Sequence, residues 1–301
     1  MIFVNVACYR DPECVPTIQD LFRKARYPDQ INVGVILQSM PSDGIELSHD
    51  RVQVCHVNAA SSMGACWARA LGYQLWRGEE YVLQIDSHMR FAPGWDATLL
   101  AQLAVCPSPK PLLTTYPPAY EPPDNLLDDH PVFLAAKHFD ERGILILHGL
   151  IEPPPPTPRP TAFLAAGFLF GPSAWIGEVP YDPCLYFHGE ETTLAARLWT
   201  NGWDLFGPTE AILWHQYVRA VRSLHWEDNR QWDRLDLVSL ARMRKLLGMG
   251  AEAHDPPVDL TGYGLGSVRT LEQYQQMSGV DFRLRTIAPH ALAGEFPLAV
   301  R

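Results

Sequence analysis

The stretch Tyr81-Val82-Leu83-Gln84-Ile85-Asp86-Ser87-His88-Met89 places a carboxylate and an imidazole at the end of an apolar run. Short runs rich in aromatic and β-branched residues are typical of buried strands. Asp86 then stands where the strand gives way to a loop. Ligands of α/β sheets bind beyond the carboxyl ends of the strands. The stretch therefore predicts a central strand over residues 81–86 with a polar site at its end.

Similar apolar runs precede this stretch in the chain. They predict buried strands at residues 2–9, 31–37 and 52–57. Apolar residues at helical spacing predict a helix between Pro16 and Pro28, a second over residues 64–75 and a third over residues 95–103. Strands that alternate with helices indicate an α/β fold with a mostly parallel, Rossmann-like central sheet and helices on both faces. Because no Gly-x-Gly-x-x-Gly follows the first strand, an ordinary dinucleotide fold is not expected.

The second half of the chain has a less regular pattern. Prolines at 117–118, 122–123 and 153–156 predict loops, with a polyproline stretch at the last of them. Further on we expect a strand over 161–170, helices over 190–201 and 231–247, a strand end at 212–215 and an irregular tail from Gly250. We expect a single domain, with a core over residues 1–220 and a helical and irregular C-terminal extension over 221–301 packed on it.

Composition limits the partners of this chain. It has 301 residues, of which 47% are hydrophobic, and a formal net charge of −10, so it can bury a large core but repels nucleic-acid phosphates. No apolar run approaches the roughly 18 residues of a transmembrane helix. The N-terminus lacks the features of a secretory signal, and the six cysteines show no Cys-x-x-Cys pairing. We therefore expect a cytoplasmic protein with no nucleic-acid partner and no membrane partner.

Asp86 and His88 form a candidate metal site. Residues at i and i+2 of an extended backbone point to the same side, so both side chains can reach one divalent ion. A carboxylate with an imidazole suits manganese-like ions better than calcium, which predicts Mn²⁺, with Mg²⁺ as the alternative. Such an ion can neutralise a diphosphate leaving group. The alternative interpretation is that Asp86 caps the loop and His88 is polar surface.

Longer stretches of the chain resemble a known family. They are residues 2–12, 78–79, 84–91, 94–96, 189–191, 196–199, 262–271 and 278–282. In this order they resemble the cytoplasmic Skp1-type N-acetylglucosaminyltransferase family over nearly the whole chain. The resemblance implies a GT-A fold, a UDP-sugar donor, a divalent metal ion and retention at the anomeric carbon. It also implies transfer of N-acetylglucosamine to a hydroxyl acceptor, for which a protein or peptide is the candidate. Residues 1–105 would bind the nucleotide, and residues 106–220 would bind the sugar and the acceptor.

More distantly, the chain resembles the polypeptide GalNAc-transferases. Those enzymes carry an Asp-x-His metal motif, a small-residue strand, a Gly-Glu helix and a later His followed by an aromatic residue and an Arg. The matching pieces here are Asp86 with His88, residues 165–170, residues 189–191, and His215 with Tyr217 and Arg219. The resemblance implies that His215 is the third metal ligand. The alternative is a core histidine beside Trp214.

Residues after the first strand are candidates for binding the nucleotide. Ala7, Tyr9, Arg10 and Asp11 lie where a uracil and ribose would be placed over the end of that strand. The acid can accept a hydrogen bond from uracil N3–H or from ribose hydroxyls, and the arginine can stack on the base or bond to it. The alternative for Arg10 and Asp11 is a turn with a surface ion pair.

Three further residues complete the predicted donor site. Arg69 could reach the diphosphate from the helix at 64–75, although a solvated arginine is an equal alternative. Ser87 stands between the two metal-ligand candidates. Gly167 would let the backbone pass close to a bound sugar, or it could be a packing glycine.

Glu190 and Glu191 are the candidate catalytic residues. Both precede a predicted helix, where negative charge also favours the helix dipole. One of them could bind the sugar or the acceptor, or act as the general base of an inverting enzyme. The competing functions are a nucleotidyltransferase or a metal-dependent hydrolase on a similar α/β sheet, and a non-catalytic sugar-nucleotide-binding protein. A nucleotidyltransferase usually requires a glycine-rich basic loop after its first strand, which this chain lacks.

Overall fold

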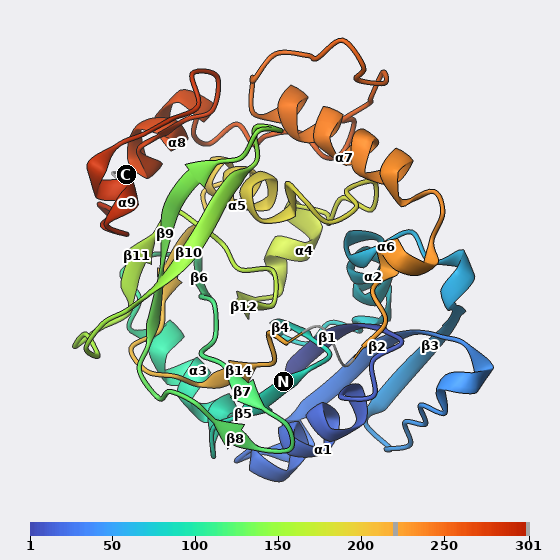
Figure 1. The fold of residues 1–301 in the computed structure, drawn as a ribbon. Helices are drawn as coiled ribbons and strands as arrows, with labels where there is room; N and C mark the ends of the chain where they lie inside the picture. The colour runs from blue at the N-terminus through green and yellow to red at the C-terminus, as the bar shows by residue number, and fades with distance from the viewer. Residues whose placement is uncertain (219–221, 299–301) are drawn as a thin grey trace.

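The computed structural model describes residues 1–218 and 222–298, which form a central sheet with helices on both faces (Figure 1). Eight strands make up this sheet, in the order β11-β13-β6-β12-β4-β1-β2-β3. In chain order they are β1 (Ile2–Tyr9), β2 (Ile31–Ser39), β3 (Val52–Asn58), β4 (Tyr81–Asp86), β6 (Pro111–Thr114), β11 (Arg159–Thr161), β12 (Phe168–Pro172) and β13 (Asp204–Gly207). The expected mostly parallel sheet is present.

Strand direction and register determine which residues meet at one edge of the sheet. β1 pairs in parallel with β2 and β4, whereas β12 runs antiparallel to β4. The register places Ala7 opposite Asp86 and Phe168 opposite Ile85. The carboxyl ends of β1 and β4 therefore meet the start of β12 at one place, which is where ligands of such sheets bind.

Helices cover the two faces of the sheet because alternate strand residues point to opposite sides. Phe3 and Val82 belong to one buried cluster with Leu194, Leu240 and Tyr274 from three helices on that face. The residues next to Phe3 and Val82 along their strands belong to a second buried cluster, which also contains residues of helices α1 and α3. The helices are α1 (Cys14–Lys24), α2 (Ala65–Gly72), α3 (Trp95–Ala104), α4 (Ala174–Glu178), α5 (Glu190–Thr200), α6 (His225–Asp228), α7 (Trp232–Leu246), α8 (Leu271–Ser278) and α9 (Pro289–Leu292).

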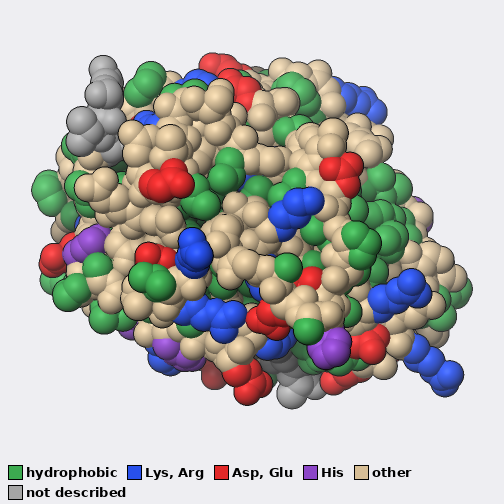
Figure 2. Space-filling model, turned by 90° about the horizontal axis from the view of Figure 1, so that it is seen from above, with side chains coloured by type: hydrophobic (Ala, Val, Ile, Leu, Met, Phe, Trp, Pro, Cys, Tyr) green, Lys and Arg blue, Asp and Glu red, His purple; other side chains and the backbone are tan. Residues whose placement is uncertain are grey.

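Short elements complete the chain. They are the 3-10 helices η1 (Pro28–Gln30), η2 (Pro41–Asp43), η3 (Ala59–Ser61) and η4 (Tyr73–Leu75), and the strand pairs β5 (Met89–Phe91) with β14 (Leu213–His215), β7 (Tyr120–Glu121) with β8 (Asn125–Leu126), β9 (Val132–Phe139) with β10 (Leu145–Ile151) and β15 (Val280–Asp281) with β16 (Thr286–Ile287). Within the described residues, no helix is long and apolar enough to cross a membrane. On the face seen in Figure 2, acidic and basic side chains are interspersed.

The structure corrects three sequence expectations. The proline-rich middle is not only loops, because the β9–β10 hairpin lies between its prolines. The single strand expected over 161–170 is wrong, since β11 ends at Thr161 and β12 begins at Phe168. Residues 162–166 between them are apolar because they are buried, not because they form a strand. The tail beyond Gly250 contains α8, whose first turn has a capping box of Thr270 and Gln273.

The C-terminal segment shares its core with the sheet. Leu240 and Met243 of α7 and Tyr274 of α8 belong to the same buried cluster as Leu194 of α5. Tyr274 also donates a hydrogen bond to the carbonyl of Ala162 at 2.9 Å. The segment is therefore joined to the sheet by a common core, while the predicted boundary near residue 220 stays a prediction.

Candidate active site

A cavity of about 520 Å³ opens at the edge of the sheet where β1, β4 and β12 meet. Its lining includes most of the residues singled out from the sequence: Ala7, Tyr9, Asp11, Arg69, Asp86, Ser87, His88, Gly167, Glu190, Glu191 and His215. Segments far apart in the chain supply these side chains. Arg10 is the one predicted site residue that does not line the cavity.

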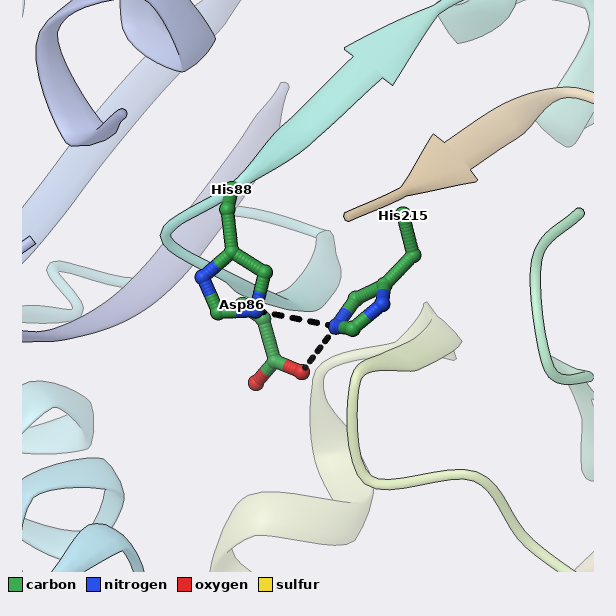
Figure 3. Close-up of side chains that lie close together, drawn as sticks. All are labelled: Asp86, His88 and His215. Carbon is green, nitrogen blue, oxygen red and sulfur yellow. Dashed lines mark hydrogen bonds and ion pairs between the residues drawn. The ribbon is translucent and has the colours of Figure 1, made fainter. Parts of the chain in front are cut away.

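Asp86, His88 and His215 converge in this cavity (Figure 3). Asp86 ends β4 and His88 follows in the loop, while His215 ends β14, which pairs with β5 so that His215 lies opposite Met89. His215 Nε2 is 3.0 Å from His88 Nε2 and 3.1 Å from Asp86 Oδ2. One donor atom from each residue lies within 4.8 Å of the other two, so the three can share one ion.

The protonation states also suit a cation. Burial lowers the pKa of His215 to about 4, so its ring is neutral at neutral pH and keeps a lone pair for an ion. Burial alone would raise the pKa of Asp86, but Arg69 and His215 beside it hold that pKa well below its usual value. The site therefore presents an anionic carboxylate with a neutral imidazole, which is a donor set for manganese-like or zinc-like ions.

Arg69 lies behind the metal-ligand candidates. Its side chain, 6% exposed, donates to Asp86 Oδ1 and to Glu190 Oε1, each at 2.5 Å. Tyr181 also donates a hydrogen bond to Glu190 Oε1. Burial disfavours the Arg69 cation, yet the neighbouring Glu190 carboxylate raises its pKa well above the usual value. Arg69 thus holds Asp86 in place, whereas its predicted contact with a diphosphate stays a prediction.

Glu190 and Glu191 have different surroundings. Glu190 is 3% exposed and bonded to Arg69 and Tyr181. Glu191 accepts hydrogen bonds from the Tyr116 hydroxyl at 2.6 Å and from the Ala166 amide at 2.9 Å. Burial raises the pKa of Glu191 to about 7. Glu191 is therefore a carboxyl that can exchange a proton near neutral pH.

The carboxylate of Asp11 faces His88. Asp11 Oδ2 lies 2.6 Å from His88 Nδ1 and accepts a hydrogen bond from Ser87 Oγ at 2.7 Å, while Oδ1 accepts from the Glu13 amide at 3.0 Å. Burial would raise the pKa of Asp11, but the hydrogen bonds from His88 and Ser87 lower it below its usual value. Because both oxygens have partners within the protein, holding His88 is favoured over the predicted contact with uracil.

Arg10 points toward the loops around the cavity. Its guanidinium pairs with Asp43 at 2.9 Å and with Asp228 of α6 at 2.8 Å. The Tyr9 hydroxyl donates to the same Asp228 carboxylate at 3.0 Å. Of the two sequence interpretations of Arg10, the ion pair is the one that the structure contains.

Gly167 is needed because of Asp86. A Cβ atom at position 167 would lie 2.6 Å from Asp86 Oδ2, closer than atoms of neighbouring residues approach. The absent side chain therefore makes room for the carboxylate of a metal-ligand candidate. Gly167 also lines the cavity, so the predicted proximity to a sugar stays a prediction.

Several residues that line the cavity were not singled out from the sequence. They are Gln38, Tyr116, residues 144–147, Tyr186 and Arg222. Tyr217, which belongs to the motif after His215, lines the cavity as well. The others carry no local signal, because they come from β2, from loops and from the β9–β10 hairpin, which the tertiary fold brings together. Arg219, the arginine of the motif after His215, lies outside the described residues.

The chain is similar to a known protein family and to solved structures. The model of a family described as Glycosyltransferase (GlcNAc) matches residues 1–53 and 41–284. No curated protein matches the chain. A structure of GalNAc-T7 with UDP, GalNAc and Mn²⁺ is similar with a TM-score of 0.61 and 14% identity, covering 92% of this chain and 56% of that one. S. aureus TarS 1-349 in complex with UDP-GlcNAc is similar with a TM-score of 0.51 and 12% identity, covering 83% and 68%.

These likenesses concern the fold. Both structures are of glycosyltransferases with a GT-A sheet, so the predicted fold class is confirmed. The chain spans little more than half the length of the GalNAc-T7 chain that it matches.

Proposed function

The chain belongs to the glycosyltransferase (GlcNAc) family, and from this we propose that it moves N-acetylglucosamine from UDP-GlcNAc to a hydroxyl acceptor with the help of a divalent metal ion. The observation that carries the proposal is the convergence of Asp86, His88 and His215 in the cavity at the sheet edge. GalNAc-T7 was solved with UDP, GalNAc and Mn²⁺, and TarS with UDP-GlcNAc, which supports a sugar nucleotide as donor.

The donor atoms present fit such an ion. One carboxylate oxygen and two imidazole nitrogens lie within 4.8 Å of one another, and this mixed set favours Mn²⁺, with Mg²⁺ as the alternative. When bound, the ion would neutralise the charge that builds on the diphosphate as the sugar bond breaks. Arg69 would keep the Asp86 carboxylate oriented toward the ion through its 2.5 Å contact.

The nucleotide would lie over the end of β1. Ala7 and Tyr9 line the cavity there together with Gln38 of β2. Arg222 also lines the cavity, with Nη1 4.0 Å from Asp11 Oδ2. A cation at that place is suited to a diphosphate. We propose that Arg222 is a basic contact of the diphosphate, because it lines the cavity near the end of β1.

We propose transfer with retention of the anomeric configuration. Glu190 is bonded to Arg69 and Tyr181, an arrangement that suits a structural carboxylate better than a base. Glu191, which lines the cavity beside Tyr116, would orient the sugar or the acceptor. NMR of the anomeric proton in the product tests this assignment, and a β-linked product would make Glu191 the general base instead.

The acceptor would enter along the other wall of the cavity. Residues 144–147 give that wall its apolar side chains, and Tyr116, Phe187 and Trp226 add aromatic side chains elsewhere in the cavity lining. Such a wall suits the side chains of a protein or peptide that surround the accepting hydroxyl. A cytoplasmic location, where such an acceptor and UDP-GlcNAc would both be present, is part of the proposal.

Binding and turnover assays test the function. We expect UDP and UDP-GlcNAc to raise the melting temperature in the presence of Mn²⁺, with a smaller effect of UDP-GlcNAc after chelation by EDTA. UDP-Gal is the matched control for the sugar. Slow release of UDP from UDP-GlcNAc would demonstrate bond cleavage, whereas binding with no release for any acceptor class would point to a non-catalytic binding protein.

A further inference from the structure

The contact between Asp11 and His88 joins two loops that follow neighbouring strands. Asp11 comes two residues after β1 and His88 two residues after β4, and these strands pair in parallel with Ala7 opposite Asp86. The parallel pairing brings the two loops together at one edge of the sheet, where Asp11 Oδ2 and His88 Nδ1 lie 2.6 Å apart. This contact is buried, with Asp11 2% exposed and His88 8% exposed.

We propose that Asp11 is a positioning residue of the metal site, which holds His88 in the Nδ1–H tautomer and thereby turns the Nε2 lone pair toward the ion. The proposal rests on the proposed function, because it assumes that Asp86, His88 and His215 bind a metal. Histidines that bind metals commonly donate their second N–H to a carboxylate, which fixes the ring and makes it more basic.

The surroundings of Asp11 explain why it can perform this role. Its carboxylate is held by the Ser87 hydroxyl and the Glu13 amide, so it cannot rotate away from His88. The free nitrogen of His88, Nε2, is the atom that lies 3.0 Å from His215 Nε2. The hydrogen bond to Asp11 thus leaves the other nitrogen of His88 facing the place where the three donor atoms meet.

The two histidines differ in this respect. His215 Nδ1 is buried and has no hydrogen-bond partner among the described residues. A carboxylate therefore holds the nitrogen of His88 that faces away from the metal site, whereas the corresponding nitrogen of His215 has no such partner in the described part of the chain. Loss of Asp11 should consequently affect His88 and leave the ring of His215 in place.

The tautomer can be measured without a metal. In ¹⁵N-labelled wild-type protein we expect the His88 ring, assigned by its disappearance in His88→Gln, to carry its proton on Nδ1. In Asp11→Leu, which has no acceptor, the proton should move at least partly to Nε2. Asp11→Asn keeps an acceptor oxygen and should largely keep the Nδ1–H form. A wild-type His88 that is protonated on Nε2 would overturn the inference whether or not the variants fold.

Metal affinity provides the second readout. We expect Mn²⁺, titrated by EPR in the presence of saturating UDP, to bind Asp11→Leu about 10–100-fold more weakly than wild type, and Asp11→Asn a few-fold more weakly. Asp20→Asn is the control, because Asp20 is an equally buried carboxylate that bonds the Phe91 amide and does not touch His88. Failure of wild type to bind Mn²⁺ contradicts the proposed function, whereas equal affinity of wild type and Asp11→Leu contradicts only the role of Asp11.

Discussion

The two walls of the cavity are built differently. On one wall the charged groups hold one another, since Asp86 and Glu190 both bind Arg69 and Asp11 binds His88. The other wall, formed by residues 144–147 with aromatic side chains of other segments, is mainly apolar. The difference suggests that the two walls have different roles. The polar wall holds the reactive groups in a fixed arrangement before substrates bind, and the apolar wall selects by its shape the molecule that binds beside them.

The rigidity of the polar wall has an energetic cause. Arg69 is a buried cation. Removing one partner of a buried ion pair destabilises the folded protein by about 3–5 kcal/mol. Asp86 and Glu190 therefore depend on Arg69, and Arg69 depends on them. Residues 144–147 have apolar, uncharged side chains, so changes there should alter binding without disturbing the polar network.

Replacing Asp86 should have the largest effect on the polar wall. Asp86→Asn removes a metal-ligand candidate and one of the two carboxylates bonded to Arg69. We expect Mn²⁺-dependent UDP binding to fall by more than about 100-fold, which corresponds to roughly 3 kcal/mol. Isothermal titration with and without Mn²⁺ measures the effect. Asp182→Asn is the matched control, because it breaks the buried pair with Arg242 outside the cavity and should cost stability but not UDP binding.

The polar wall is also the part of the site that the sequence predicted best. Asp86 and His88 are two residues apart on one strand end, so a local pattern was sufficient. β1 and β4 lie over the expected ranges 2–9 and 81–86. His215 joins them only through the β5–β14 pairing, and its place was implied by a family resemblance. The contact of Asp11 with His88 depends on strand register, which local sequence does not reveal.

The strands of the apolar wall could not be predicted from the sequence, because prolines lie on both sides of them. The β9–β10 hairpin lies between Pro131 and Pro153, so the prolines flank the strands and do not interrupt them. In residues 162–166 the opposite error occurred, since a buried irregular segment has the same apolar composition as a strand. Both errors arise where tertiary burial, rather than periodicity, determines the residue types.

Glu191 lies between the two walls and should make stability depend on pH. Its pKa is raised from 4.5 to about 7 by burial, so the folded state binds its proton more tightly than the unfolded state. This contribution to stability is full below about pH 4.5 and is lost as pH rises through about 7. Glu191→Gln removes the ionisation, so its free energy of unfolding relative to wild type should improve from pH 5 to pH 8, by up to about 3 kcal/mol.

Urea unfolding at both pH values measures this change. Glu121→Gln, at an exposed position of β7, serves as the control and should show no comparable dependence. Equal stability differences at pH 5 and pH 8 for Glu191→Gln would show that Glu191 ionises like an ordinary surface carboxyl.

Shortening a side chain of the apolar wall tests whether the two walls act independently. Leu147→Ala removes apolar surface from the cavity without touching the polar network. We expect the KM for an acceptor to rise by about 2–10-fold, which corresponds to roughly 0.5–1.4 kcal/mol of lost apolar contact, while UDP affinity stays the same. Ile151→Ala is the control, because it lies on the same strand, is 60% exposed and does not line the cavity. A loss of UDP affinity in Leu147→Ala would show that the two walls are coupled.

The smallest effect is expected at Arg10, which belongs to neither wall. One of the two sequence interpretations puts Arg10 against the uracil, where loss of a charge-assisted hydrogen bond would weaken UDP binding by about 1–3 kcal/mol. In the structure its guanidinium is paired with Asp43 and Asp228, and its side chain is 22% exposed. Pairs of this kind contribute up to about 1 kcal/mol.

Arg10→Ala should therefore change UDP affinity by less than about three-fold in isothermal titration. Asp43→Asn, which weakens the same pair from its other side, should behave alike if the pair only steadies the loops beside the cavity. A ten-fold loss in Arg10→Ala that Asp43→Asn does not share would mean that Arg10 leaves its acidic partners and reaches the nucleotide. In that case the polar wall would extend past the end of β1, and Arg10 would become part of the donor site.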